Sequence, residues 1–216
     1  MSRCAVFWDF GGVVTTSPFE AFQRFERERG LPQGIIQRIN VTNPDTNAWA
    51  QFERSALDAD GFDRAFAAEA AALGVQIGGR EVLGLLAGGL RPNMVATIKR
   101  LKADGLKQAC ITNNMPEGAA LGTARPPEER AAMDGVMELF DSVLESSKLG
   151  VRKPEPKIYE LACAALNVQP HEAVYLDDLG VNLKPARAMG MATIKVESEA
   201  QALADLAKAL GRDHLP

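Results

Sequence analysis

Acidic and polar residues directly follow four of the apolar runs in this sequence. Asp9 ends VFWD, Thr112-Asn113 end ACITN, Glu145-Ser146-Ser147 follow DSVL, and Asp177-Asp178 end VYLDD. In open α/β sheets, ligands bind beyond the carboxyl ends of the strands. We therefore expect these groups to gather at one edge of a sheet.

The acidic members of this set predict a Mg²⁺ site. Carboxylates that are brought together repel one another unless a positive charge lies between them. Mg²⁺ held by carboxylates, a backbone carbonyl, waters and a substrate phosphate is the usual solution. Gly11-Gly12, directly after Asp9, allow a ligand to approach the backbone closely. The alternative is a turn at Asp177-Asp178 and a cap at Asp9, which is ordinary for one site but weak for two sites at matching strand ends.

Three further residues are candidates, and each has an ordinary alternative. The Thr112 hydroxyl and the backbone N–H groups after it suit phosphate oxygens, although threonine is also common in strands. Lys153 in GVRKPEPKIY precedes an expected helix and suits a carboxylate and a phosphate together; a solvated loop lysine is the alternative. Asn182 in YLDDLGVN suits hydrogen bonds to the neighbouring aspartates, or a capping or surface position.

Asp9-Phe10-Gly11 also spells the metal-binding DFG of protein kinases. We reject a kinase because the sequence has neither an HRD catalytic loop nor a GxGxxG loop, and DFG stands near its start. The Gly11-Gly12 pair is not a P-loop either, since GK[ST] is absent.

The elements that must position these residues alternate along the chain. Apolar runs predict strands over 4–8, 107–111, 141–145, 173–177 and 192–196. Amphipathic stretches predict helices over 91–104, 127–138, 155–166, 180–189 and 199–210. This alternation is typical of an α/β fold, with a parallel sheet covered by helices on both faces. The sequence does not determine the strand order.

The stretch between the first strand and Arg91 contains no convincing strand. Segments 18–29, 46–57 and 61–73 predict helices, with glycine and proline between them. We therefore predict a small helical insert at 17–88, with Gly88-Gly89 as its return hinge. The core domain would then comprise 1–16 and 89–216.

The substrate and the oligomeric state are left open. We interpret the insert's aromatic residues as its own core, with an apolar substrate cleft as the alternative. Arg54 and Arg64 are candidate contacts for a charged substrate. The connection over 113–135 suits either a cleft wall or a dimer interface, so both a monomer and a homodimer remain open. The aromatic residues concerned are Trp49, Phe52, Phe62 and Phe66.

Composition excludes several classes of protein. The 216 residues are 46% hydrophobic and 24% charged, which is ordinary for a globular chain. A net charge of −4 argues against a general nucleic-acid binder. The three cysteines are far apart, without CxxC spacing, and predict reduced core residues of a cytoplasmic protein. Neither a signal-peptide core nor an apolar run of the roughly 20 residues that a membrane span needs is found.

Taken in order, four motifs resemble those of the haloacid dehalogenase-like hydrolase superfamily. They are Asp9 in VFWDFGGVV, Thr112 in ITNN, Lys153 in GVRKPEPKIY and Asp177-Asp178 in YLDDLGVN. The resemblance covers nearly the whole chain, because the helical insert stands where the family's C1-type cap belongs. The stretches ESxxxGxxKPEPxIY and LDDxGxNLKPARxxGM are similar to the N-terminal phosphatase domain of bifunctional epoxide hydrolases.

This resemblance implies a three-layer Rossmann-like core and a Mg²⁺-dependent phosphatase of a small organic phosphate. Asp9 would attack the phosphate ester and form an aspartyl-phosphate, which water then cleaves. Lys153 would hold Asp9 in place. The phosphoryl group would be bound by Thr112, Asn113 and Gly12.

The resemblance also implies a ligand set for Mg²⁺. The ion would be bound by the Asp9 carboxylate, the Gly11 carbonyl and Asp178. Asp177 and Asn182 would support these ligands. The metal and the lysine together would offset charge crowding in the transition state.

One position departs from the family's pattern. Phosphatases of this superfamily usually carry a second aspartate two residues after the nucleophile, as general acid and base, and here that residue is Gly11. Such a group is worth roughly 10²–10⁴-fold in rate, although some active phosphatases of the superfamily also have glycine there. Two alternatives therefore stay open. One is a weak or inactive binding or regulatory protein that keeps the fold, and the other is a metal-independent haloacid-type dehalogenase.

Overall fold

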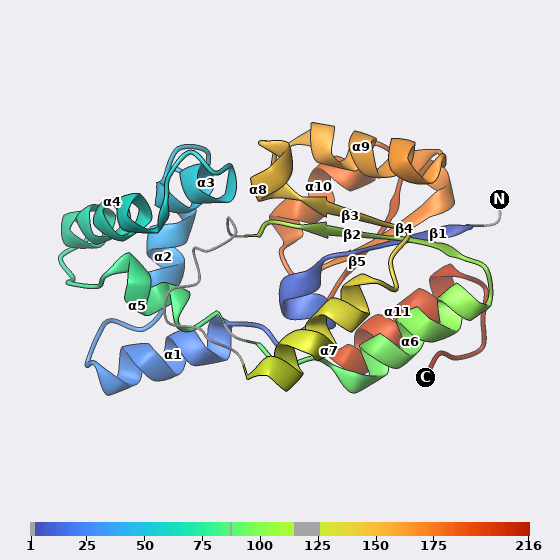
Figure 1. Cartoon of the computed structure of the whole chain (residues 1–216), viewed down its shortest axis with the longest axis horizontal. Helices are drawn as coiled ribbons and strands as arrows, with labels where there is room; N and C mark the ends of the chain where they lie inside the picture. The colour runs from blue at the N-terminus through green and yellow to red at the C-terminus, as the bar shows by residue number, and fades with distance from the viewer. Residues whose placement is uncertain (1–2, 87, 115–125) are drawn as a thin grey trace.

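A five-stranded parallel sheet forms the centre of the protein in a computed structural model that describes residues 3–86, 88–114 and 126–216 (Figure 1). The strand order is β3-β2-β1-β4-β5. The α/β class is confirmed, and each predicted strand lies within one residue of an observed one. The strands are β1 (Ala5–Trp8), β2 (Lys107–Thr112), β3 (Ser142–Glu145), β4 (Ala173–Asp177) and β5 (Ala192–Lys195).

The central strand β1 is buried on both faces. Val6 and Trp8 pack into one hydrophobic layer, and Ala5 and Phe7 pack into the other. Strands of parallel sheets are covered on both sides, so they consist of continuous apolar runs. Each fully buried large side chain contributes about 1.5–3 kcal/mol. Burial therefore fixes the strand whose end carries Asp9.

Helices cover the two faces of the sheet, which gives three layers (Figure 1). The first layer contains α6 (Pro92–Ala103), α7 (Pro127–Met137) and α11 (Glu199–Ala209). The second contains α9 (Pro156–Leu166) and α10 (Gly180–Ala188). Two short helical segments, α8 (Ser146–Leu149) and Pro170–Glu172, complete this part.

In the described residues, β1 is followed by a short helical turn, Phe10–Val14, and then by five helices that form the helical insert, which stands apart from the sheet (Figure 1). They bury a hydrophobic core of their own, in which Phe52, Phe62 and Phe66 are inaccessible to solvent and Trp49 packs at the edge. This supports our interpretation of these aromatic residues. The sequence did not predict α2 and α5. The helices are α1 (Phe19–Glu28), α2 (Ile35–Val41), α3 (Ala48–Glu53), α4 (Ala59–Ala72) and α5 (Gly79–Leu83).

The chain leaves and re-enters the sheet region through two adjacent segments. Thr15 and Leu90 form an antiparallel bridge, and the Thr16 N–H donates to the Gly89 carbonyl at 2.8 Å. A side chain at Gly88 would lie 2.4 Å from the Thr16 carbonyl oxygen, so glycine is needed for this close approach. The division into domains at 17 and 88 stays a prediction.

The cysteines are free, and the prediction that all three lie in the core is wrong for one of them. Cys110 and Cys163 are buried, but Cys4 is exposed. Cys4 directly precedes β1 and lies outside the buried strand. In the described part of the chain, no helix is long and apolar enough to span a membrane. Residues 115–125 of the predicted connection over 113–135 lie outside the described residues.

Candidate active site

The register of the sheet brings the first and last motifs together. Trp8 of β1 pairs with Leu176 of β4, so Asp9 and Asp177 are the next residues on neighbouring strands. The Asp9 N–H donates to the Leu176 carbonyl at 2.9 Å, which continues the ladder by one bond. Two residues that are far apart in sequence therefore meet at the carboxyl edge of the sheet.

Lys153 lies between these two carboxylates. Its Nζ is 2.7 Å from Asp9 Oδ1 and 2.9 Å from Asp177 Oδ2, and the residue is only 1% exposed. Burial acts to lower the pKa of the ammonium, but the charges of Asp177 and Asp9 together raise it above its ordinary value. Lys153 is therefore a permanent cation inside the site, and the solvated-loop alternative is wrong.

Asp177 is saturated with hydrogen bonds. Its carboxylate accepts bonds from the Leu179 N–H at 2.8 Å, from Asn182 Nδ2 at 3.0 and 3.1 Å, and from the Tyr175 hydroxyl as well as Lys153. The backbone carbonyl of Asn182 accepts a bond from the Tyr159 hydroxyl at 2.7 Å, which holds the first turn of α10 in place. This geometry fits a supporting residue that positions others. The sequence analysis did not name Tyr175 as a site residue. Its position was available from the sequence, because Tyr175 lies two residues before Asp177 on the same strand and side chains two apart on a strand share one face.

Asp178 extends over Gly12. A Cβ built on Gly12 would lie 2.2 Å from Asp178 Oδ2, and Gly12 has a φ of +79° that strains any other residue. Burial, followed by the charge of Asp177, raises the pKa of Asp178 to about 6, against the opposing effects of Lys153 and Arg91. Asp178 thus occupies the space that a side chain at position 12 would need.

Asp9 uses one of its two carboxylate oxygens for contacts within the protein. Both the Phe10 N–H and Lys153 Nζ lie 2.7 Å from Oδ1. Among the described residues, no hydrogen-bond donor reaches Oδ2. Burial raises the pKa of Asp9 well above its ordinary value, and the charges of Asp177 and Asp178 add to this while Lys153 opposes it. The free oxygen is available to a ligand.

The acidic cluster suits a hard divalent cation. Asp9, Asp177 and Asp178 each offer a carboxylate oxygen, and these oxygens lie within 4.8 Å of one another. Oxygen ligands are those that Mg²⁺ prefers. Because Asp177 is saturated by its own donors, Asp9 and Asp178 are the two carboxylates left for an ion. The glycine at position 12, where any side chain would displace Asp178, belongs to the same cradle.

Gly11 is not required by the backbone. Its φ of −69° and ψ of 126° are ordinary for any residue, and a Cβ there would meet nothing within 4 Å. The side chain that the family's phosphatases usually carry at this position would therefore fit. Its absence is a property of the sequence and not a consequence of crowding.

The motif of Thr112 and Asn113 lies beside that of Asp9 and contacts that of Lys153. Thr112 ends β2, is 7% exposed and pairs in register with Glu145 of β3. The side chain of Asn113 bonds to the backbone of Lys153, with the Lys153 N–H donating to Oδ1 at 2.9 Å and Nδ2 donating to the Lys153 carbonyl at 3.0 Å. Asn113, a candidate ligand for phosphate, therefore also fixes the lysine segment.

The helical insert contributes charged residues that sequence reasoning missed or misjudged. Glu53 lies 2.5 Å from Arg152 Nε and accepts a bond from Asn113 Nδ2 at 3.1 Å. Arg54, which the sequence offered as a contact for a charged substrate, is instead ion-paired to Glu155 at 2.6 Å. Glu53 gave no sequence signal, because its partners lie 60 and 99 residues away along the chain.

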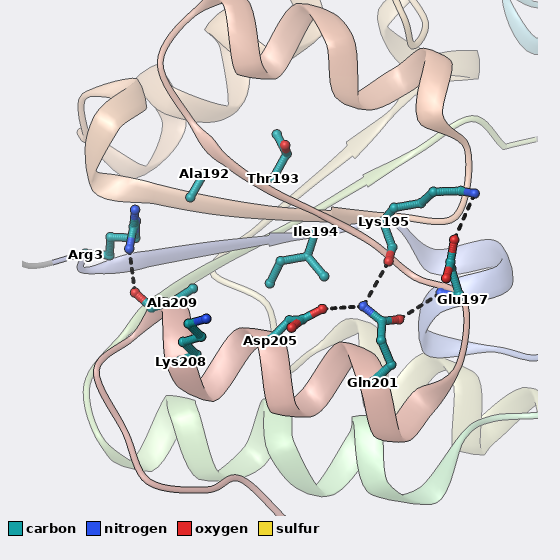
Figure 2. A pocket seen from close by; sticks show the side chains of 10 residues that line it. All are labelled: Arg3, Ala192, Thr193, Ile194, Lys195, Glu197, Gln201, Asp205, Lys208 and Ala209. Atoms are coloured by element: carbon teal, nitrogen blue, oxygen red, sulfur yellow. Dashed lines mark hydrogen bonds and ion pairs between the residues drawn. The ribbon is translucent and has the colours of Figure 1, made fainter.

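A surface groove of about 580 Å³ lies away from this cluster, between β5 and α11 (Figure 2). Most of its polar groups bond to one another: Arg3 donates to the Ala209 carbonyl, and Gln201 donates to Asp205 and to the Lys195 carbonyl. It contains none of the candidate catalytic residues, so the acidic cluster remains the candidate active site despite the groove's size.

Comparison with known proteins identifies the family. The profile of a hydrolase family, described as haloacid dehalogenase-like hydrolase, matches residues 5–190. The chain belongs to this family. The resemblance carried by the four sequence motifs is thereby confirmed for this haloacid dehalogenase-like (HAD) hydrolase.

Relatives of the HAD hydrolase include much longer proteins. Acyl-CoA dehydrogenase family member 10 of Mus musculus is 32% identical over 214 residues, which are 96% of this chain and 19% of that protein. Bifunctional epoxide hydrolase 2 of Mus musculus is 39% identical over 125 residues, 56% of this chain and 21% of that protein. The HAD hydrolase thus spans about a fifth of the length of these curated relatives. Sesquiterpene phosphatase astK of Aspergillus oryzae is 26% identical over 215 residues, 96% of each chain.

Solved structures share the fold of the HAD hydrolase. A HAD family enzyme of Bacteroides thetaiotaomicron, in complex with magnesium and inorganic phosphate, has a TM-score of 0.57 and 14% identity, and covers 89% of this chain and 93% of that chain. L-2-haloacid dehalogenase of Xanthobacter autotrophicus, with chloropropionic acid covalently bound, has a TM-score of 0.60 and 19% identity, covering 99% and 85%. At these identities the likeness establishes the fold alone.

Proposed function

We propose that this HAD hydrolase is a Mg²⁺-dependent phosphatase of a small organic phosphate, acting through an aspartyl-phosphate on Asp9. The observation that carries the proposal is the asymmetric environment of Asp9. Its Oδ1 contacts Lys153 and the Phe10 N–H, while no donor from the described residues reaches Oδ2. A carboxylate held by one oxygen, with the other free, is arranged as a nucleophile.

The first chemical step follows from this geometry. Asp9 Oδ2 forms a bond to phosphorus as the bond from phosphorus to the ester oxygen breaks, and the ester oxygen leaves with the electron pair. Lys153 keeps the nucleophile in place and opposes the negative charge that accumulates during transfer. Thr112, Asn113 and Gly12 border the same edge of the sheet. We assign the Thr112 hydroxyl and the backbone N–H groups of Asn113 and Gly12 to the phosphoryl oxygens, because the Asn113 side chain is already bonded to Lys153 and Glu53.

The cluster fits Mg²⁺ on its donor chemistry, and we assign the carboxylates of Asp9 and Asp178 and the carbonyl of Gly11 to the ion. When bound, Mg²⁺ supplies positive charge to the transferring phosphoryl group and reduces repulsion between nucleophile and substrate. Asp177 and Asn182 hold Lys153 and the strand end in position through their hydrogen bonds. The HAD enzyme solved with magnesium and phosphate supports this assignment.

The second step is hydrolysis of the aspartyl-phosphate. Water adds to phosphorus as the bond to Asp9 breaks, so the carboxylate is regenerated and inorganic phosphate leaves with both protons of the water. The ester oxygen released in the first step takes its proton from the solvent. No side chain at Gly11 protonates the leaving group or takes the proton of the water. Esters whose leaving oxygen is weakly basic therefore react fastest, because they depart without a general acid.

The helical insert is assigned the role of a cap domain over 17–88. Its aromatic residues fill its own core, so they do not form an aromatic wall for the substrate. Relatives named as phosphatases, such as the sesquiterpene phosphatase of Aspergillus oryzae, support a phosphate ester as substrate.

A metal-independent dehalogenase is the second candidate, because structures of that activity share the fold and because Gly11 lacks an acid. The acidic cluster argues against it, since among the described residues its three carboxylates share one buried cation, Lys153, and the remaining negative charge favours a bound metal ion. A binding protein without activity is the third.

A substrate panel distinguishes the three functions. Aryl and alkyl phosphates and 2-haloacids are incubated with the protein, with Mg²⁺ or with a chelator. We expect phosphate release with Mg²⁺ alone. Halide release in chelator would instead favour the dehalogenase, and no product under any condition would favour the binding protein.

A further inference from the structure

Lys153 lies in a segment without regular secondary structure, residues 151–155, ahead of α9. Its backbone is fixed by one side chain from another motif. The Lys153 N–H donates to Asn113 Oδ1 at 2.9 Å, and the Lys153 carbonyl accepts a bond from Asn113 Nδ2 at 3.0 Å. The orientation of a single amide therefore sets the backbone from which the catalytic ammonium extends.

Glu53, at the end of α3 in the helical insert, fixes that orientation. Asn113 Nδ2 has a second hydrogen and donates it to Glu53 Oε2 at 3.1 Å. An ionised carboxylate only accepts hydrogen bonds. A reversed Asn113 amide would place its oxygen against this carboxylate and its NH₂ group against the Lys153 N–H. Glu53 therefore reinforces the one arrangement in which the Asn113 amide holds the Lys153 backbone.

The charge of Glu53 is maintained by Arg152, the neighbour of Lys153. The Nε–Oε2 distance is 2.5 Å, and the two side chains are 13% and 14% exposed. Burial raises the pKa of Glu53, while Arg152 opposes that rise most strongly and Lys153 adds to the opposition. Glu53 thus joins the lysine segment through an ion pair as well as through Asn113.

These contacts all cross from the helical insert to the α/β core. Arg54 pairs with Glu155 at 2.6 Å, and the Ser55 hydroxyl donates to the Ser147 carbonyl at 2.7 Å. They flank the Glu53 contacts and fix the end of α3 against α8 and the lysine segment. The Glu53 contact with Asn113 exists only while the insert lies against the core.

We propose that Glu53 is a positioning residue for Lys153, through which the helical insert sets the lysine that holds the nucleophile. The inference rests on the proposed function, because it assigns Glu53 to the same phosphoryl transfer. It predicts that loss of the Glu53 charge lowers kcat, since displacement of a catalytic group by about 1 Å can cost 10²-fold. KM changes little, because Glu53 does not touch the substrate.

The test compares Glu53→Gln with a matched control, Glu81→Gln. Glu81 forms a 2.6 Å ion pair with Arg29 inside the insert, remote from Lys153. With an aryl phosphate and Mg²⁺, we expect E53Q to lower kcat about tenfold and to change KM less than about twofold. E81Q should keep both constants. A wild-type kcat in folded E53Q would overturn the proposal, as would an equal loss in E81Q.

Amide hydrogen exchange of the peptide that contains Lys153 gives a readout independent of activity. We expect the Lys153 amide to exchange about tenfold faster in E53Q than in wild type and E81Q, because its acceptor on Asn113 loses a fixed orientation. Unchanged exchange would refute the proposal even if the wild type proved inactive, whereas inactivity alone would refute only the phosphatase function. If E53Q does not fold, Glu53→Asp, whose carboxylate is withdrawn by one methylene, is measured in the same way.

Discussion

Removal of one carboxylate from the acidic cluster should have opposite effects on activity and on stability. In Asp178→Asn, a neutral amide of the same shape replaces a carboxylate that lies beside two others. We expect this variant to lose Mg²⁺-dependent activity and yet to unfold at a higher denaturant concentration than the wild type when no divalent metal is present.

The magnitude follows from the pKa of Asp178, which is raised from 3.8 to about 6. Each pH unit corresponds to about 1.4 kcal/mol, so the shift corresponds to about 3 kcal/mol. Asp178 is partly exposed, and screening by solvent reduces the expected gain to about 2 kcal/mol. The folded state binds the proton more tightly than the unfolded state. The loss of folding stability caused by the Asp178 carboxylate is therefore absent below the pKa of the unfolded state. It is complete once the pH exceeds the pKa of the folded state.

The assay is urea unfolding of wild type, Asp178→Asn and a control, Asp213→Asn, whose carboxylate is exposed and outside the cluster. In chelator, the variant should gain about 2 kcal/mol over wild type near pH 7.5 and much less near pH 4. Mg²⁺ at about 100 times its Kd should stabilise wild type by about 2.7 kcal/mol and leave the variant unchanged.

Two results would refute this reasoning. If Asp178→Asn is less stable than wild type in chelator near neutral pH, the carboxylate is not under repulsion. If Mg²⁺ stabilises both proteins equally, Asp178 is not a ligand. Asp213→Asn should match the wild type under every condition, which guards against a general effect of removing one negative charge.

Three further substitutions test individual features of the site. Gly11→Asp should raise turnover of alkyl phosphates by about tenfold or more, because it adds a general acid where a side chain fits; a fall in rate would show that another group already fills that role. Gly12→Ala should abolish Mg²⁺ activation, since its Cβ would lie 2.2 Å from Asp178 Oδ2, while Gly89→Ala, with nothing within 4 Å, should not. Lys153→Met leaves two buried carboxylates without their cation and should lower the free energy of unfolding by about 3–5 kcal/mol; a wild-type unfolding curve in urea would contradict the buried ion pairs.

The sequence predicted the strands well because their apolar runs are buried on both faces, which leaves little ambiguity of period. It did not predict the order of the strands, since pairing joins residues that are about a hundred positions apart, such as Trp8 and Cys110. Helices α2 and α5 have seven and five residues, too short for an amphipathic pattern to be recognised. The six-residue α3 was predicted only as part of the longer stretch 46–57.

Part of the site was predicted because the ends of the strands could be recognised in the sequence. Asp9 and Asp177 stand at strand ends, so their meeting follows from a parallel sheet. The hydrogen bonds of Asn113 do not follow, because its side-chain partners come from the lysine segment and from the insert. Glu53 was missed entirely, since only the packing of the insert on the core brings it to Asn113. Local patterns indicate elements and their ends, but contacts between units depend on the whole fold.

The central claim is that Asp9 becomes phosphorylated during turnover. The direct measurement is mass spectrometry of the Asp9 peptide after wild type is mixed with an aryl phosphate and Mg²⁺ and quenched in acid within the first turnover. We predict the added mass of one phosphoryl group on that peptide, and neither this mass nor phosphate release in Asp9→Asn. Equal rates of phosphate release by the two proteins, or a phosphoryl group on another peptide, would contradict the account.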